Sequence, residues 1–433
     1  RRRELNMTPA NELSATQARA AMGRGALTAS DLLAACLDRI ARREDAVRAW
    51  CQLDADGARV AARVLDGLGT QDADPGQPLF GLPVGVKDII ETHDLPTAYG
   101  SAAYVGHQSS VDAACVAGVR AAGGMVMGKT VTTEFAYFQP GKTTNPHNPD
   151  HTPGGSSSGS AAAVADFMVP LAFGTQTGGS VIRPAAFCGV VGYKASYGAL
   201  PLFGVKALSH DLDTLGMFCR EVADVHLMRA ALVGAPTTGD DARPRVGLCK
   251  TYEWDQADGD SQAAVLASAK NLEAAGAQLV DVDLPAPFAE LVARQKEVMA
   301  QNAARDLAFE YHNHRDRLSR HIIALIEQGL DVSYPVYQAA LSAAALARQS
   351  LTEIFSTVDV LLCPSATGQA PKRGNGTGDP VFNSMWTLLG NPCINLPGHR
   401  GATDLPVGVQ AVGAMGRDEV LLSHCRWMER RIV

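Results

Sequence analysis

Apolar residues along this chain alternate between helical spacing and short uninterrupted runs. In residues 28–43 they recur every three or four positions, at Leu32, Leu33, Cys36, Leu37 and Ile40. Similar spacing predicts helices at 55–68, 111–122, 261–274, 288–328 (with breaks), 336–355 and 418–430. Uninterrupted runs predict strands at 84–90, 125–127, 245–249, 278–282, 358–363 and 407–412. An alanine-rich helix is expected to begin near Ser160.

This alternation of strands and helices predicts an α/β architecture, in which helices cover a large central sheet. A length of 433 residues would by itself predict two or three domains, but no linker divides the chain. We therefore expect one domain over residues 28–430, preceded by an N-terminal segment with a first helix in residues 1–27.

Composition and charge narrow the function classes. With 46% hydrophobic and 19% charged residues, the chain is typical of a soluble globular protein with a large core. A net charge of −7 gives no electrostatic basis for binding nucleic acid or an anionic membrane. The longest apolar stretch, 161–173, contains Asp166 and Pro170 and is too short to cross a bilayer. Nine scattered cysteines without a Cys-x-x-Cys pair favour reduced thiols, so the cytoplasm is the default location.

Two glycine-flanked serine clusters are the most informative feature for function. Residues 154–160 read Gly-Gly-Ser-Ser-Ser-Gly-Ser, residues 174–180 read Gly-Thr-Gln-Thr-Gly-Gly-Ser, and Lys87 ends an apolar run upstream. Serine needs a base to take its proton. A lysine can be that base only if burial keeps it neutral, because an exposed lysine titrates near pH ~10.4. The pattern therefore indicates a serine hydrolase that works without histidine.

With these motifs the chain resembles the amidase signature family, and within it the malonamidase-like branch, over about residues 30–415. The matching segments are 81–88, 152–162 and 174–185, with weaker matches at 128–130, 212–216 and 390–397. The two serine motifs in this order are highly specific, whereas either one alone would be weak. The resemblance implies a single large mixed β-sheet sandwiched between layers of α-helices.

The resemblance also implies a role for each motif residue. Ser180 would be the nucleophile, Ser156 would follow a cis peptide bond and relay protons, and Lys87 would be the base. Backbone N–H groups would form the oxyanion hole, namely those of Thr177, Gly178 and Gly179. The implied activity is metal-independent hydrolysis of the C–N bond of a small-molecule amide through an acyl-enzyme, without a cofactor. The same site could cleave carbamates and esters.

Three further residues of the matching segments bear on this interpretation. A carboxylate at Asp88 would hold the lysine charged, but adjacent strand residues point to opposite faces, so we expect it to point away. Arg183 stands third after the nucleophile, where the commoner family pattern has arginine second. Its guanidinium could bind a substrate carboxylate, or it could bond backbone carbonyls around Pro184. Gln176 stands where many relatives have aspartate, which leaves the local hydrogen bonding open.

Three competing signals carry less weight. Residues 155–159 match the Gly-x-Ser-x-Gly elbow, which would make Ser157 the nucleophile, but a proline-rich loop precedes them instead of a strand. Residues 123–130 fit the P-loop pattern formally, yet they follow a helix and contain the predicted strand. His147 and His151 are spaced as loop histidines usually are, so we expect no metal site there.

The substrate stays open between two hypotheses. Arg183 favours a small amide that carries a carboxylate. A bulky amide, anilide or carbamate is the other, because several apolar residues could line a pocket: Phe203, Met385, Trp386 and Leu389. A different function is also open, since relatives of this family serve as glutaminase subunits of tRNA-dependent amidotransferase complexes. The shorter chain argues against that role. We expect neither a nucleic-acid nor a membrane partner, and a homodimer is left open.

Overall fold

A single mixed sheet organises the computed structural model, which describes residues 8–68, 77–234 and 241–433. Its eleven strands lie in the order β1-β3-β2-β4-β6-β5-β10-β11-β9-β7-β8. They are β1 (Trp50–Leu53), β2 (Pro83–Lys87), β3 (Met125–Thr130), β4 (Leu171–Gln176), β5 (Val191–Lys194), β6 (Thr214–Cys219), β7 (Arg245–Cys249), β8 (Gln278–Val282), β9 (Val360–Pro364), β10 (Cys393–Arg400) and β11 (Pro406–Val412). Parallel pairs join β2 to β3 and β4, and β7 to β8 and β9, while the other neighbours are antiparallel.

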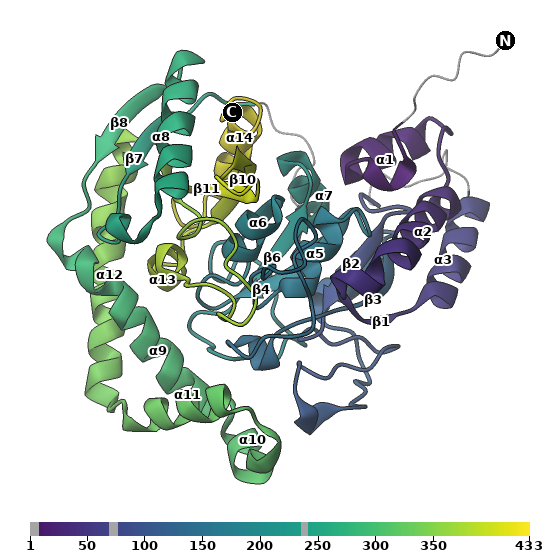
Figure 1. The fold of residues 1–433 in the computed structure, drawn as a ribbon, viewed down its shortest axis with the longest axis horizontal. Coiled ribbons are helices and arrows are strands. Elements are labelled where there is room, and N and C mark those ends of the chain that lie inside the picture. Colours follow the sequence, from purple (N-terminus) through teal and green to yellow (C-terminus); the bar gives the residue numbers. More distant parts are fainter. Residues whose placement is uncertain (1–7, 69–76, 235–240) are drawn as a thin grey trace.

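Helices flank this sheet, which confirms the predicted fold class (Figure 1). They are α1 (Ala15–Gly23), α2 (Ala29–Val47), α3 (Ala55–Leu68), α4 (Ala114–Ala121), α5 (Ser158–Ala165), α6 (Ile182–Cys188), α7 (Val222–Val233), α8 (Gly259–Ala274), α9 (Leu291–Asp306), α10 (Ala308–Asn313), α11 (Arg320–Asp331), α12 (Tyr334–Thr357), α13 (Val381–Leu388) and α14 (Asp418–Met428). In the described ranges, none of them has the combined length and apolar character that a membrane crossing needs.

Helix α2 shows how the sequence pattern becomes structure. The Thr28 hydroxyl accepts the backbone N–H of Asp31 at 3.0 Å, which satisfies one of the free donors at the start of the helix. The predicted apolar positions, from Leu32 to Ile40, are all buried. At the other end Arg48 adopts a left-handed conformation that stops the helix. The amphipathic pattern therefore located this helix correctly.

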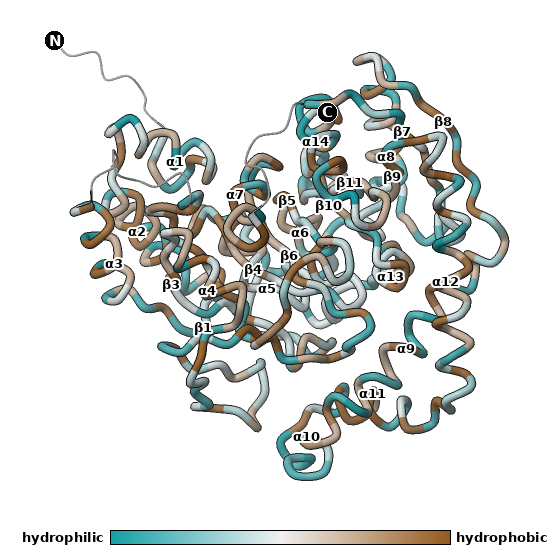
Figure 2. The backbone as a smooth tube through the Cα atoms, turned by 180° about the vertical axis from the view of Figure 1, so that it is seen from behind, coloured by the Kyte–Doolittle hydropathy of each residue, from teal (hydrophilic) through white to brown (hydrophobic). Residues whose placement is uncertain are grey.

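The central strands are buried along their whole length, as the strands β4, β6, β9 and β11 show. A strand covered on both faces reads as a continuous apolar run and does not alternate. Figure 2 shows this as hydrophobic colouring at the centre of the molecule. The run at 358–363 therefore predicted β9. No strand was predicted at β5 or β10, because the lysine, glycine and asparagine residues within them break the apolar run.

Strand β2 ends earlier than predicted. The predicted run of 84–90 continues to Ile90, but the strand stops at Lys87. The Lys87 carbonyl accepts the N–H groups of Ile89 at 2.7 Å and Ile90 at 2.9 Å, so the backbone turns there. Lys87 thus sits at the carboxyl end of a buried strand.

Helices α9, α10 and α11 form an arm that extends from the sheet-containing body (Figure 1). Its tip is fastened to the body by Glu310, whose carboxylate accepts hydrogen bonds from Lys206 and from the Tyr104 hydroxyl, each at 2.6 Å. Nearby, the N–H of Ser319 donates to the Glu134 carboxylate at 3.0 Å. The arm is therefore attached to the body at its far end.

Candidate active site

Lys87 is the last residue of β2, and all residues of this strand are buried in the protein interior. Its side chain has no exposed surface. The Nζ atom donates to Ser156 Oγ at 2.7 Å and to Thr175 Oγ1 at 2.8 Å. The three side chains come from β2, from the loop before α5 and from β4, so the fold itself brings them together.

The electrostatic surroundings of Lys87 favour a neutral amine. Burial lowers its pKa well below the ordinary value for lysine, and the nearby charge of Asp213 opposes this shift. Asp88 pairs with Lys129 instead, with 3.4 Å between Oδ1 and Nζ. The expectation that Asp88 would point away from Lys87 thus agrees with the geometry.

Ser156 lies in a tightly packed loop that leads into α5. The peptide bond between Gly155 and Ser156 is cis, and the Ser156 carbonyl accepts the N–H of Thr133 at 3.2 Å. A side chain at Gly155 would approach Thr377 Cγ2 within 2.9 Å, so this position needs glycine. The loop therefore holds the Ser156 hydroxyl against Lys87.

Ser180 lies in the turn between β4 and α6, two residues before the helix begins. It lines the same cavity as Ser156. Within the described residues its hydroxyl has no hydrogen-bond partner, so it is free to meet a substrate. At Gly179 a Cβ atom would lie 2.3 Å from Asn383 Oδ1, which explains why only glycine fits beside this serine. The chain thus presents bare backbone N–H groups next to a free hydroxyl.

Gln176 supplies the local hydrogen bonding that the sequence left open. Its Oε1 accepts the N–H groups of Val181 at 2.8 Å and Ile182 at 3.1 Å, at the start of α6. Its Nε2 donates to Thr387 Oγ1 at 3.0 Å, and that hydroxyl donates to the Gly178 carbonyl at 2.7 Å. The side-chain amide of Gln176 therefore holds the turn through its oxygen, which accepts, and through its nitrogen, which donates. Only a side chain with both an acceptor and a donor can do this.

Asp213 is a buried carboxylate beside this turn. It accepts hydrogen bonds from the Thr177 hydroxyl at 2.5 Å and from the N–H groups of Leu208 at 2.8 Å and Ser209 at 3.0 Å. Burial raises the pKa of Asp213 to about 6, and the hydrogen bonds act in the opposite direction. The negative charge of this carboxylate raises the pKa of Lys87.

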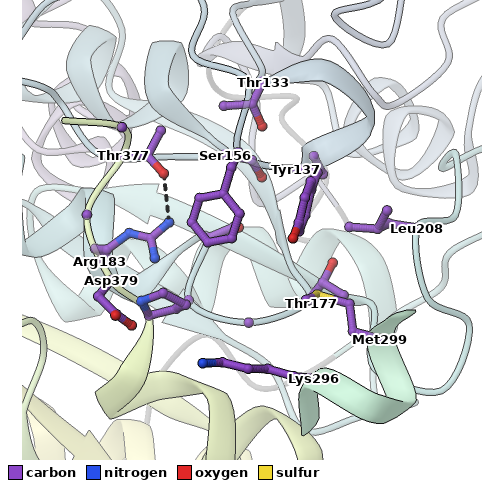
Figure 3. Close-up of a pocket in the computed structure, with 18 of the residues that line it drawn as sticks. Thr133, Tyr137, Ser156, Thr177, Arg183, Leu208, Lys296, Met299, Thr377 and Asp379 are labelled. Atoms are coloured by element: carbon purple, nitrogen blue, oxygen red, sulfur yellow. Dashed lines mark hydrogen bonds between the residues drawn. The ribbon is translucent and has the colours of Figure 1, made fainter. Parts of the chain in front are cut away.

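Ser156 and the turn from Thr177 to Ser180 open onto a cavity of about 620 Å³ between the body and the arm (Figure 3). The body contributes Tyr137, Phe138 and the turn that ends at Ser180. The arm contributes Gln295, Lys296, Met299, Leu325 and Gln328, and residues between Thr367 and Pro380 line a further part. Figure 3 shows Tyr137 directed into this space, with Lys296 and Asp379 on the side opposite Thr133. The cavity lining is thus aromatic and apolar around Tyr137 and Phe138 and charged around Lys296 and Asp379.

Arg183 lines the cavity but is already engaged. Its Nη2 donates to the Gly155 carbonyl at 2.7 Å and to Thr377 Oγ1 at 3.2 Å. Its Nε and Nη1 are buried and make no hydrogen bond in the described part of the chain. Burial lowers the pKa of Arg183 to about 10, and the charge of Asp379 opposes the shift. The guanidinium therefore supports the loop of Ser156 and retains two unpaired donors.

A model of the protein family described as Amidase matches residues 31–422. The chain belongs to this family. Among its relatives is a glutamyl-tRNA(Gln) amidotransferase subunit from Roseiflexus castenholzii, which is 33% identical and aligned over 96% of this chain and 95% of the relative. The corresponding subunit from Oleidesulfovibrio alaskensis is 31% identical, with 96% of each chain covered.

Solved amidase structures agree with this assignment. The crystal structure of an amidase is 29% identical, with a TM-score of 0.89 over 96% of this chain and 99% of the other. The peptide amidase of Stenotrophomonas maltophilia is 27% identical, with a TM-score of 0.83 over 98% of this chain and 97% of the other. The predicted family and fold are confirmed, while the malonamidase-like branch stays a prediction.

One prediction about the cavity of this amidase-family chain was wrong. None of the apolar residues proposed to line it does so: Phe203, Met385, Trp386 and Leu389. Phe203 is 68% exposed on the surface, and the other three are buried in a hydrophobic core cluster. Apolar character alone does not distinguish a core residue from a cavity residue. The cavity uses Tyr137, Phe138 and Met299 instead.

Residues of the three competing motifs make contacts within the fold. The Ser157 hydroxyl is fully buried and bonds the backbone of Thr175, so it faces away from solvent. Residues 125–130 of the P-loop-like stretch form β3 itself. His147 contacts the Cys188 carbonyl at 2.8 Å.

Several residues of the site were not found from the sequence. Thr175, Asp213, Gln295 and Thr387 each contact Lys87 or the turn before Ser180. Thr175 lies inside a recognised motif and could have been considered. The other three are 36 to 209 positions from their partners in this turn. Asp213 lies in the weaker family match at 212–216, which could have drawn attention to it, whereas nothing in the local sequence marks Gln295 or Thr387.

Proposed function

We propose that this chain hydrolyses the C–N bond of an amide, with Ser180 as the nucleophile, Ser156 as the relay and Lys87 as the base. The observation that carries the proposal is the Lys87 amine, buried and 2.7 Å from Ser156 Oγ. Because burial lowers the pKa of Lys87, the neutral amine can accept a proton where an exposed lysine would be charged.

In the first half-reaction Ser180 Oγ attacks the carbonyl carbon of the amide. The proton of Ser180 passes to Ser156, and the proton of Ser156 passes to Lys87 Nζ. Backbone N–H groups from Thr177 to Ser180 stabilise the negative oxygen of the tetrahedral intermediate. The C–N bond then breaks, and the leaving nitrogen takes a proton back from Lys87 through Ser156.

The second half-reaction regenerates the enzyme. Water attacks the acyl-enzyme and gives its proton to Lys87 through the same relay. The ester bond to Ser180 then breaks, and its oxygen recovers a proton by the same route. The Ser180 hydroxyl makes no bond to another described residue, so we propose that substrate binding closes its link to Ser156. Apo sites commonly have such open hydrogen bonds.

A small-molecule amide is one candidate substrate, and carbamates or esters could follow the same route. The cavity of about 620 Å³ is within the usual range for ligand sites. Its aromatic and apolar wall supports a bulky amide or carbamate. The two unpaired donors of Arg183 support a substrate with a carboxylate instead.

Glutamine is the second candidate, with the chain acting as the glutaminase-type subunit of an amidotransferase complex. The curated relatives favour this candidate over the first. Lys296 and Asp379 line the cavity with opposite charges that would suit the carboxylate and ammonium groups of glutamine. One feature counts against it. The alignment to the first relative spans 472 positions, more than the 433 residues of this chain, so that relative has segments absent here.

Both parts of the proposal can be tested with one panel of substrates. The purified chain, with no partner added, would be given glutamine, a dicarboxylic monoamide, aliphatic amides, an anilide and a carbamate, and released ammonia or amine would be measured. Ser180→Ala should abolish activity, while the matched control Ser157→Ala should keep most of it. Ser157→Ala inactive with Ser180→Ala active would reverse the assignment of the nucleophile.

The preferred substrate then separates the candidates. Hydrolysis of glutamine that increases when an amidotransferase partner is added would support the second candidate. Turnover of other amides but not glutamine would support the first. Arg183→Met should then lower activity on the dicarboxylic monoamide more than on neutral amides. An equal loss on both would remove carboxylate recognition from the proposal.

A further inference from the structure

The turn before Ser180 has an unusual feature: each of its three peptide carbonyls is held from a different direction. The Thr177 carbonyl accepts from Gln295 Nε2 at 2.9 Å. The Gly178 carbonyl accepts from Thr387 Oγ1 at 2.7 Å, and the Gly179 carbonyl accepts from the N–H of Arg183 at 3.1 Å. In a planar trans peptide the carbonyl and the following N–H point in opposite directions. A hydrogen bond that fixes one of these carbonyls therefore also fixes the direction of the N–H of the following residue.

Gln295 differs from the other two donors in its origin. It lies on α9 of the arm, whereas Thr387 and Arg183 belong to helices packed into the body. Its side chain is 1% exposed, and its Nε2 is also 3.8 Å from the Met299 sulfur. Lys296 and Met299, which follow it on α9, line the same cavity as Thr177 (Figure 3). One face of α9 thus lies directly against this turn.

We infer that Gln295 is a positioning residue, which aims the Gly178 N–H at the oxyanion and makes the oxyanion hole depend on the docked arm. The inference rests on the proposed function of this turn. The Gly178 N–H belongs to the same peptide plane as the Thr177 carbonyl, so loss of the Gln295 bond frees that plane to rotate. Thr387 and Arg183 would still hold the next two planes, so the loss should be partial.

A purely structural role is the alternative, in which Gln295 only satisfies a buried carbonyl. An unsatisfied carbonyl destabilises the fold but need not slow the chemical step. The two roles therefore differ in kcat, because an oxyanion contact acts in the transition state and not in substrate binding. They differ also in the affinity for an inhibitor that forms a tetrahedral oxyanion.

The experiment compares two glutamines of one helix. Gln295→Met removes the donor at similar length. Gln301→Met is the matched control, because Gln301 is also buried on α9 but contacts Asn302 and Arg305 within the arm. For each, kcat, KM, the melting temperature and the inhibition constant of a trifluoromethyl ketone analogue of the best substrate would be measured.

Gln295→Met should lower kcat about 10- to 100-fold, less than the 10²- to 10³-fold typical of a deleted oxyanion donor, with KM nearly unchanged. The ketone should bind more weakly by a similar factor. Gln301→Met should lower the melting temperature without this loss. Equal kcat values for the two variants would overturn the inference. If Gln295→Met does not fold, Gln295→Leu removes the donor with a smaller side chain, and the same outcomes apply.

The wild-type chain and Ser180→Ala keep this test separate from the proposed function. If the wild type hydrolyses no amide, or Ser180→Ala stays active, the proposed function fails whatever Gln295 does. If the wild type is active, Ser180→Ala is not, and Gln295→Met has normal kcat and normal ketone affinity, only the inference fails.

Discussion

Two buried lysines on neighbouring strands have different surroundings. Lys87 ends β2, and Lys129 lies beside it in β3, where it pairs with Val86 in a parallel register. Neither side chain has any exposed surface. Lys87 contacts the hydroxyl groups of Ser156 and Thr175, whereas Lys129 contacts the Asp88 carboxylate, Thr97 and the Ile90 carbonyl.

The difference shows that burial alone does not make a lysine a base. Burial lowers the pKa of both amines, but for Lys129 the adjacent Asp88 carboxylate opposes the shift directly. An ion pair holds a proton in place, while a neutral amine against hydroxyl groups can exchange one. The contacts therefore favour a structural role for Lys129 and support the proposed role of Lys87 as the base.

Replacing each lysine by methionine should give the largest contrast. Lys87→Met removes the proposed general base, which typically contributes 10²- to 10⁴-fold, so kcat should fall by about 10³-fold. Lys129→Met leaves the Asp88 carboxylate buried without its partner, which should lower the free energy of unfolding by about 3–5 kcal/mol. Amide turnover and urea unfolding of both variants would measure the two effects.

The reverse outcome would break the comparison. If Lys129→Met folds with wild-type stability but loses activity, Lys129 is the more important lysine for the reaction. Activity of Lys87→Met close to that of wild type would remove Lys87 from the mechanism.

A second experiment changes the charge that faces Lys87. Because the Asp213 carboxylate raises the pKa of Lys87, Asp213→Asn should lower that pKa further. Activity is lost as pH falls and Lys87 becomes protonated, so the acid limb of kcat against pH should move to lower pH. Asparagine can keep the contacts, with Oδ1 accepting from Leu208 and Ser209 and Nδ2 donating to Thr177.

Asp88→Asn is the control for this shift, since Asp88 faces Lys129 and not Lys87. Its acid limb should stay at the wild-type position. If the acid limb of kcat against pH moves equally in both variants, that limb does not reflect the protonation of Lys87.

The sequence distinguished these lysines only through the motif around each. Both follow apolar runs, and residues 123–130 around Lys129 even fit a nucleotide-binding pattern. Burial was expected for Lys87, but its partners come from segments 69 and 88 positions away. Lys87, Ser156 and Ser180 could be proposed because each lies in a recognisable local motif. Gln295 lies in no such motif, and Asp213 lies only in the weaker match at 212–216, so their roles became visible only from how distant segments pack.

The fold was predictable to a similar extent. Amphipathic helices such as α2 and α3 and continuous apolar strands such as β9 carry their signal within a few residues. Strand β5 contains a glycine and Lys194, whose buried amine bonds the Ala195 carbonyl, so its sequence does not read as a core strand. Tertiary contacts, and not local pattern, decide such elements.

The smallest effect to measure is the pH dependence of stability. Folding lowers the pKa of Lys87 below about 10.4, the value for an unfolded lysine. At a pH between these two pKa values, the lysine is protonated in the unfolded state and neutral in the folded state. Stability therefore rises with pH across that window, by at most about 1.4 kcal/mol per pH unit for one proton. Lys87→Met lacks this rise of stability with pH. Its stability relative to wild type should therefore be greatest near pH 7 and should decrease toward pH 10.

Urea unfolding of wild type and Lys87→Met at pH 7, 8, 9 and 10 would measure this difference. Lys129→Met serves as the comparison, because Asp88 reduces the shift of its lysine and should make the slope smaller. Parallel stability curves for wild type and Lys87→Met would mean that Lys87 titrates as an ordinary lysine. The buried amine would then be protonated at neutral pH and could not serve as the base, whatever its distance from Ser156.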